Sequence, residues 1–142
     1  MPPRPAFAAL APFAALLAAA APAPAAGQDA LAAQIAGDRG CPGCDLRRAS
    51  LRDLQTLTAD LSGANLRESD LKGAQLPNAS FAGADLRRAE MERLLAPESD
   101  FTEAKLRDAD LEKSRLERSI FSQADIRGAD LASAKVDGAL FG

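Results

Sequence analysis

The sequence predicts an all-β coil in which short walls surround a narrow core, and two regularities of the chain carry this prediction. From residue 44 to residue 142, every fifth residue is an anchor, mostly Leu or Phe, without insertion or deletion. The residue two positions before each anchor is small, mostly Ala and otherwise Ser or Cys, except at Leu54 and Leu94. This period fits neither an α-helix nor an ordinary strand. We therefore expect each short wall to turn one large and one small side chain inward.

The repeat unit is clearest in Ala64-Asn65-Leu66-Arg67-Glu68, Ala84-Asp85-Leu86-Arg87-Arg88 and Ala129-Asp130-Leu131-Ala132-Ser133. In these units the chain resembles the pentapeptide-repeat family, whose signature is a small residue, then Asp or Asn, then Leu, then two polar residues. The resemblance covers residues 44–142, about twenty consecutive units in one register. It implies a right-handed quadrilateral parallel β-helix, with one pentapeptide per side and about five coils in total.

Side chains twenty residues apart test the four-sided coil, because four walls of five residues place them above one another. All Phe residues outside the N-terminal segment fall in one column, which consists of Phe81, Phe101, Phe121 and Phe141. A second column consists of Arg47, Arg67, Arg87, Arg107 and Arg127. Stacked coils pair as strands do, at a rise of ~4.8 Å. We therefore expect stacked Phe rings in the core and a line of Arg side chains on one outer wall.

Residues 1–26 differ from the rest of the chain in composition. Arg4 is their only charge, an Ala/Leu/Phe run follows, and Ala-Pro-Ala-Pro-Ala-Ala precedes Gly27. This layout is typical of a signal peptide. A membrane anchor and a disordered tail are the alternatives, but the apolar run is shorter than the ~20 residues that a spanning helix needs. We expect a cleaved signal, a periplasmic or secreted protein, and no transmembrane segment in the mature chain.

Residues 27–43 are expected to form an N-terminal capping segment before the β-helix of residues 44–142. Within it, residues 28–38 should form a short helix in which Leu31 and Ile35 face one side and Gly37 ends the helix. Solenoids need their open ends covered, so we expect this helix to cap the first coil.

Cys41-Pro-Gly-Cys44 is the only chemically reactive motif of the sequence. Haem attachment would need His after the second Cys, where Asp45 stands. A zinc site needs four ligands, and the chain has no other Cys and no His, so only a site shared between chains would be complete. A disulfide or a buried thiol pair, a thiol-redox role and a shared metal stay open. For an exported chain we favour the disulfide.

The Arg column has two interpretations. Guanidinium groups ~5 Å apart on one wall could hold a polyanion such as phosphate groups, a sulfated sugar or an anionic lipid. Four of these Arg residues are, however, followed three positions later by an acid, and these acids are Asp70, Glu90, Asp110 and Asp130. On the other side, two positions before an Arg of the column, lie Asp45, Asn65, Asp85 and Asp125. We therefore favour a structural charge ladder, balanced by the acid columns, over an anion-binding ladder.

The C-terminal coil is a candidate dimer end. The sequence closes with Leu140-Phe141-Gly142, and Ile120 and Leu140 place apolar side chains where this wall otherwise carries Asp or Ser. Known members of the family form C-terminal coil-to-coil dimers, so the resemblance implies a homodimer through this end. A frayed monomer end is the alternative.

The sequence argues against an enzyme. His is absent, so no Ser or Thr has the usual base to activate it. Asp70, Glu90 and Asp110 form a column, but an outer wall offers no cleft that would perturb their pKa values. We expect no catalysis, cofactor or metal. The net charge of −3 argues against nonspecific nucleic-acid binding.

The function predicted from these observations is a non-catalytic exported scaffold that mediates protein–protein or surface binding to an unknown protein or envelope component. The resemblance adds an alternative, since some pentapeptide-repeat proteins mimic B-DNA and interact with DNA gyrase. That role would need a cytoplasmic chain with a strongly acidic surface. A thiol-redox protein that uses Cys41 and Cys44 is the third hypothesis.

Overall fold

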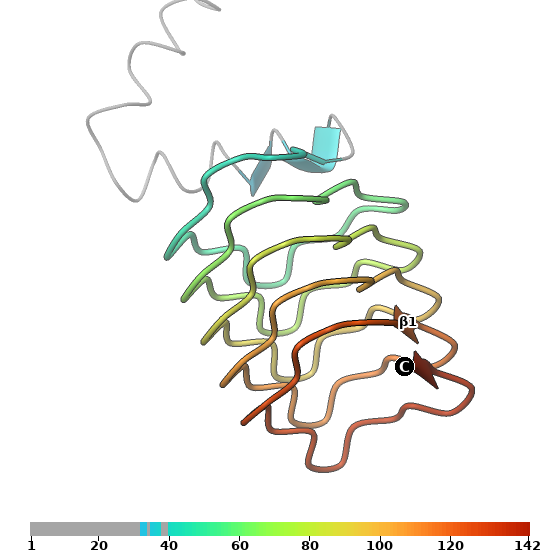
Figure 1. Ribbon diagram of the computed structural model, residues 1–142. Coiled ribbons are helices and arrows are strands. Elements are labelled where there is room, and N and C mark those ends of the chain that lie inside the picture. Colours follow the sequence, from blue (N-terminus) through green and yellow to red (C-terminus); the bar gives the residue numbers. More distant parts are fainter. Residues whose placement is uncertain (1–31, 34, 38–39) are drawn as a thin grey trace, which may run out of the picture.

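The computed structural model describes residues 32–33, 35–37 and 40–142, and in this part the chain winds into stacked four-sided coils (Figure 1). Parallel bridges join residues twenty positions apart along the whole rod, such as Asp45 to Asn65 and Asp85 to Lys105. Most walls pair through a single residue. Two-residue strands form near the C-terminal end of the rod, where β1 (Ile120–Phe121) pairs in parallel with β2 (Leu140–Phe141). In this pair Ile120 lies opposite Leu140.

The four walls are named here by their characteristic residues. The Arg wall consists of the units that begin at residues 44, 64, 84, 104 and 124. The acidic wall, the Pro wall and the Phe wall begin five, ten and fifteen residues later in each coil. The Arg wall carries eight cationic and five acidic side chains, whereas the acidic wall carries four cationic and seven acidic ones. Opposite net charges therefore lie on adjacent walls.

Each corner of the coil is a four-residue turn. The Leu66 N–H donates to the Asp85 carbonyl of the next coil (2.7 Å), and the Ser69 N–H donates back to the Leu66 carbonyl across the corner (3.1 Å). Glu68, between them, has a φ of 58°. The equivalent residue of every unit from 43 to 138 has positive φ. This left-handed conformation is unfavourable for most side chains, so the pairing between coils must hold each corner in place.

The anchors and the small residues fill the interior, as the period of five predicts. Phe101 is fully buried between two other rings of its column. Its ring centroid lies 4.8 Å from that of Phe81 and 4.7 Å from that of Phe121, with interplanar angles of 6° and 3°. Phe121 and Phe141 continue the stack at 4.9 Å. The ring spacing equals the rise between paired strands, so the Phe column predicted from the sequence is confirmed.

The two units that break the small-residue rule compensate at their anchors. Leu54 and Leu94 point into the core and are buried. The anchors two residues later are the small Thr56 and Ala96, where most other units carry Leu or Phe. Because the interior is packed at crystal-like density, one large and one small side chain per wall fit, and their order within the wall can be exchanged.

Buried Ser hydroxyls complete two corners of the Pro wall. The Ala79 N–H donates to Ser99 Oγ (3.0 Å), and this hydroxyl donates to the Leu76 carbonyl (3.2 Å). In the next coil the Ser99 N–H donates to Ser119 Oγ (3.1 Å), which donates to the Ala96 carbonyl (2.9 Å). Each hydroxyl thus stands between a carbonyl and an amide that would otherwise meet directly across the corner. These buried backbone groups are satisfied in this way.

The N-terminal end of the described chain packs on the core. Residues 32, 33 and 35–37 are helical, and Ile35 is fully buried within the core cluster. The Gly40 N–H donates to the Ile35 carbonyl (2.9 Å), and Gly40 pairs with Asp60. The pairing of coils therefore begins inside the segment 27–43 that the sequence assigned to capping.

The predicted signal peptide, residues 1–26, lies outside the described residues, and so does Leu31 of the expected helix. Within the described part of the chain, no helix has the length and apolarity needed to cross a membrane.

Candidate functional site

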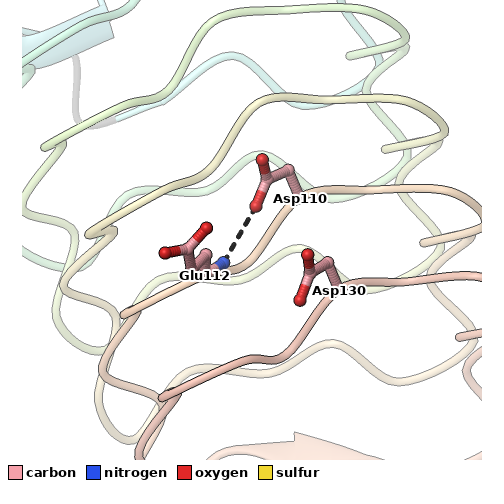
Figure 2. Close-up of side chains that lie close together, drawn as sticks. All are labelled: Asp110, Glu112 and Asp130. Atoms are coloured by element: carbon pink, nitrogen blue, oxygen red, sulfur yellow. Dashed lines mark hydrogen bonds between the residues drawn. The ribbon is translucent and has the colours of Figure 1, made fainter.

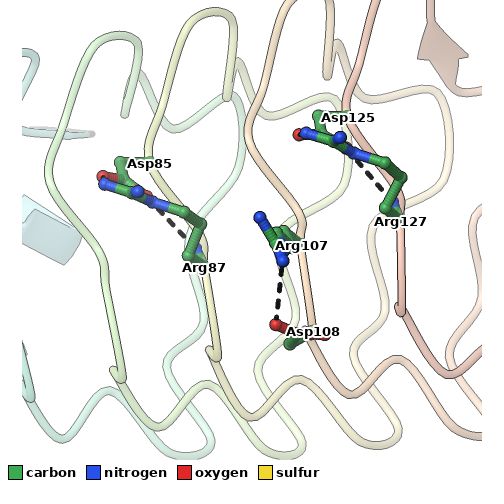
Figure 3. A network of polar contacts seen from close by, with 6 residues as sticks. All are labelled: Asp85, Arg87, Arg107, Asp108, Asp125 and Arg127. Carbon is green, nitrogen blue, oxygen red and sulfur yellow. Dashed lines mark hydrogen bonds and ion pairs between the residues drawn. The ribbon is translucent and has the colours of Figure 1, made fainter.

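The Arg wall is the candidate site, and three of its five column residues are paired with the Asp two positions earlier. Arg87 donates from Nε to Asp85 Oδ1 (2.8 Å) and from Nη2 to Asp85 Oδ2 (2.6 Å), and Figure 3 shows the side chain lying along the wall toward this carboxylate. Arg127 pairs with Asp125 in the same way (2.8 and 2.7 Å). The third pair is Arg47 with Asp45 (2.9 and 2.8 Å).

The same carboxylates fix the turns in which the Arg residues lie. Asp85 Oδ1 also accepts the backbone N–H of Arg87 (3.3 Å), and Asp125 Oδ1 accepts that of Arg127 (3.2 Å). These bonds explain why the second position of the repeat favours Asp or Asn, whose short side chains reach the backbone two residues on. The side-chain hydrogen bond from Arg127, with its backbone N–H, lowers the pKa of Asp125 to about 2. The side-chain hydrogen bond from Arg87 likewise lowers the pKa of Asp85.

Of the two acid columns that the sequence offered as balancing charge, the flanking one pairs with the Arg column, through Asp45, Asp85 and Asp125. The acids three residues after four of the Arg residues lie around the corner, on the acidic wall, and two of them, Asp70 and Glu90, pair with cations of that wall. Arg52 Nη1 lies 3.2 Å from Asp70 Oδ2, and Lys72 Nζ lies 2.6 Å from Glu90 Oε2. A residue two positions back shares its wall with the Arg, whereas a residue three positions on is turned away by the corner.

Two members of the Arg column lack an Asp at the position two residues earlier. Asn65 precedes Arg67, and Lys105 precedes Arg107. Arg67 Nε is buried without a hydrogen-bond partner among the described residues. For Arg107, Figure 3 marks one ion-pair contact, to Asp108, whose Oδ2 lies 3.7 Å from Arg107 Nε. This separation is too long for a hydrogen bond.

A hollow opens in the wall beside each of these two residues. The first has a volume of about 470 Å³ and is lined by Arg67 together with Asp45, Arg47, Arg48 and Glu68. The second has a volume of about 510 Å³, and its charged lining consists of Arg87, Glu103, Lys105, Arg107, Asp125 and Arg127. All five residues of the Arg column line one of the two hollows, and along the wall Arg residues that pair with Asp alternate with Arg residues that do not.

The acidic wall brings three carboxylates together (Figure 2). Oxygen atoms of Asp110, Glu112 and Asp130 lie within 4.8 Å of one another. Such oxygens are the ligands that Ca²⁺ and Mg²⁺ prefer, but Asp110 Oδ1 already accepts the Glu112 N–H (3.0 Å) and Glu112 pairs with Lys113 Nζ (3.0 Å). The period of twenty places Asp110 and Asp130 in one column but does not indicate Glu112. The signal in the sequence that could have indicated Glu112 is its position two residues after Asp110, within the same turn.

The Cys motif and the C-terminal coil lie at opposite ends of the rod. The structure joins Cys41 and Cys44 in a disulfide, with Cα atoms 5.6 Å apart, where the chain enters the first complete coil. In the last coil, Leu140 and Phe141 are 60% and 47% exposed, and in the coil before it Ile120, opposite Leu140, is 38% exposed. These values make the C-terminal face the largest gathering of exposed apolar side chains at either described end.

Comparison with known proteins supports the fold. The sequence matches the description "Pentapeptide repeats" in eight copies over residues 59–93 and 98–141, which is more than half of the chain. A pentapeptide repeat protein from the thylakoid lumen of Arabidopsis thaliana is similar, with 26% identity and a TM-score of 0.64 over 66% of this chain. The match spans 65% of that protein's length, just under two thirds. A search of curated proteins gives no match.

Two further solved structures are similar in fold. A pentapeptide repeat protein from the cyanobacterium Cyanothece 51142 has 21% identity and a TM-score of 0.50, covering 74% of this chain and 92% of its own. A trypsin-treated form of QnrB1, a plasmid-mediated fluoroquinolone resistance protein, has 14% identity and a TM-score of 0.50, covering 70% of this chain and 57% of its own. These likenesses support a right-handed parallel β-helix. The repeats, their stacking and these similarities together show that the chain belongs to the pentapeptide repeat family.

Proposed function

We propose that this protein is a non-catalytic, exported repeat scaffold that binds a protein or another component of the cell envelope through an outer wall. The observation that carries this proposal is that the interior of the rod holds the apolar core while two outer walls carry the charged side chains. The interior is filled by anchors and small residues, while the Arg and acidic walls present charged side chains at fixed spacing. Such a rod offers binding surfaces rather than a pocket for catalysis.

Photo-crosslinking residues placed at single positions of two walls test the binding proposal. Position 105 represents the Arg wall and position 78 the Pro wall, and both side chains are exposed. In the native cell we expect a discrete adduct from one wall and none from the other. Equal adducts from both positions, or none from either, would contradict a wall-specific scaffold.

Export is the part of the proposal that separates it from a role in the cytoplasm. Its support is the composition of residues 1–26. Cell fractionation, with mass spectrometry of the N-terminus, should find a chain that begins near Gly27 outside the cytoplasm. An intact chain in the cytoplasm would overturn export and make an assay of DNA gyrase supercoiling the next step.

The proposal includes how the ends of the rod are held. We assign about five coils to residues 40–142 and a capping role to the helical residues before them, since Ile35 is buried against the core. The Cys41–Cys44 disulfide closes the junction between cap and coil. For so short a loop, chain entropy gives the disulfide about 2 kcal/mol of stability. Two fast-reacting thiols in the native protein, found by thiol titration, would favour a redox role instead.

We further propose that two copies stack through their C-terminal coils. Among the described residues, nothing pairs with the outer edge of β2, and Leu140 and Phe141 are exposed there. Sedimentation should show a dimer that Leu140→Glu converts to a monomer, while the matched change Leu57→Glu, at an exposed Leu on the Pro wall, leaves it intact. A wild-type protein that stays monomeric at high concentration would refute this assembly.

A further inference from the structure

Each Arg of the column, together with the residue two positions before it, is called a rung here. A rung is closed where that residue is an Asp that pairs with the Arg, and open where it is not. At the closed rungs, Asp45, Asp85 and Asp125 each accept hydrogen bonds from Nε and Nη2, along one edge of the Arg guanidinium group. At the open rungs that position holds Asn65 or Lys105. Neither can supply a carboxylate, and the guanidinium groups of Arg67 and Arg107 keep donors for another acceptor.

We propose that the open rungs, Arg67 and Arg107, bind oxyanions of the phosphate or sulfate kind, each in the hollow beside its guanidinium group. This inference rests on the proposed function, because it names the ligand chemistry of one wall of the scaffold. A guanidinium group presents a planar fork of N–H donors that matches two oxygens of such an anion. The closed rungs use this same fork for Asp, which shows that the wall geometry permits bidentate pairing.

Rung 107 is the stronger of the two sites. Lys105 lies in the same hollow as Arg107 and forms no ion pair with any residue in the described part of the chain. The hollow of rung 67 is also lined by Arg47, which pairs with Asp45, and by Arg48, which lies 3.7 Å from Glu68, so among the described residues only Arg67 brings it a cation without an ion pair. Arg87 and Arg127 also line the hollow of rung 107, but Nε and Nη2 of each already donate to Asp85 or Asp125.

Two observations show that Arg67 and Arg107 have guanidinium N–H donors without a hydrogen-bond acceptor among the described residues. Arg67 Nε is buried without a partner among the described residues, which is a costly state for a charged donor. Arg107 reaches only Asp108, at 3.7 Å. Three carboxylates oppose an anion at rung 107. Glu103 lines the hollow and has no cation within 4.0 Å among the described residues, Asp125 lines it as the partner of Arg127, and Asp108 lies 3.7 Å from Arg107 Nε.

The closed rungs serve as internal controls in the experiment that tests this proposal. Inorganic phosphate is titrated into the protein at constant ionic strength, with chloride as the matched salt, while NMR follows the Nε–H signal of each Arg. We expect the signals of Arg67 and Arg107 to shift and saturate, with tighter binding at Arg107. The signals of Arg47, Arg87 and Arg127 should stay in place. Equal shifts of all five, or the same shifts with chloride, would show ionic screening alone and overturn the proposal.

Single substitutions that add or remove an Asp two positions before an Arg should weaken or create phosphate binding at that Arg. Lys105→Asp copies the sequence of a closed rung and should weaken phosphate binding at Arg107 by at least about tenfold, the effect of losing one charge-assisted hydrogen bond, without changing Arg67. Asp85→Asn should open Arg87, whose signal then responds to phosphate. Glu103→Gln should tighten binding at Arg107. If Lys105→Asp leaves binding at Arg107 unchanged, the rung rule is wrong.

Free sulfate and dextran sulfate then identify the source of the anion. The open rungs lie two coils apart, ~10 Å at the spacing of paired strands, so one polymer chain can reach both. Dextran sulfate that binds far more tightly per sulfate than the free ion indicates a polymer, and equal affinity indicates a small ion. Failure of both at the open rungs would overturn the anion site, while the photo-crosslinking result for the scaffold would stand by itself.

Discussion

Replacing Phe101 by Ala should be among the most damaging single changes in the core. The ring is fully buried and stacks on Phe81 at 4.8 Å and on Phe121 at 4.7 Å. Burial of a Phe side chain and the cavity that its removal leaves are worth about 3–5 kcal/mol. Stacked pairs add about 0.5–1.5 kcal/mol each beyond the area that they bury. We therefore expect the free energy of unfolding to fall by about 4–8 kcal/mol.

Two further variants separate burial from stacking and from position. Phe101→Leu keeps most of the apolar volume, and Leu61 occupies the same column, so only the two stacks are lost and the cost should be about 2 kcal/mol. Phe141→Ala removes a ring that is 47% exposed and has one stacking neighbour, and it should cost about 1–2 kcal/mol.

Urea unfolding followed by circular dichroism measures these three costs, provided that the dependence on urea concentration is the same for each variant. The expected order is Phe101→Ala, then Phe101→Leu, then Phe141→Ala close behind it. Equal midpoints for the two Ala variants would refute the argument that the central stack carries more of the stability than the end of the rod. A Phe101→Leu variant as stable as wild type would show that stacking adds nothing.

Three further predictions concern the backbone and the charges of the rod. Ser119→Ala should cost about 1–3 kcal/mol in urea unfolding, because two buried backbone groups lose the hydroxyl that bridges them, whereas Ser114→Ala, at a corner that keeps its direct backbone bond, should cost less. Gly40→Ala should destabilise the first coil and expose its amides to hydrogen exchange, since φ is 141° and the new Cβ would lie only 2.8 Å from the Asp60 carbonyl carbon. The pKa of Asp125 is lowered to about 2 in the folded protein, so its contribution to stability should be complete above pH ~4 and be lost as the pH falls toward 2. Thermal unfolding of Asp125→Asn should be less dependent on pH in that window, and an unchanged dependence would contradict the pairing.

The repeat could be predicted from the sequence because large and small side chains recur at fixed positions along the chain. A large side chain at every fifth position and a small one two residues earlier suit only a coil with narrow walls, and residues twenty apart then have to stack. The same reasoning predicted the Phe column, including its spacing. It did not predict that Thr56 and Ala96 compensate for Leu54 and Leu94, because that exchange depends on the volume available in each layer.

The charge pairing could not be settled from the sequence. For Arg87, Asp85 and Glu90 are both close along the chain, and opposite charge alone does not choose between them. The corner of the coil does, since it keeps Asp85 on the same wall and turns Glu90 onto the next. Glu112 was missed for the same reason, because its place beside Asp110 and Asp130 depends on how one turn directs its side chains.

By itself, the sequence determined the period, the identity of the core and the family to which the chain belongs, because these depend on apolar volume repeated along the backbone. The tertiary structure decided which charges meet, which Ser hydroxyls bridge corners, and which two Arg residues of the column are left without a hydrogen-bonded carboxylate. These features arise where neighbouring coils and adjacent walls come together, at distances of a few ångströms that linear spacing does not specify.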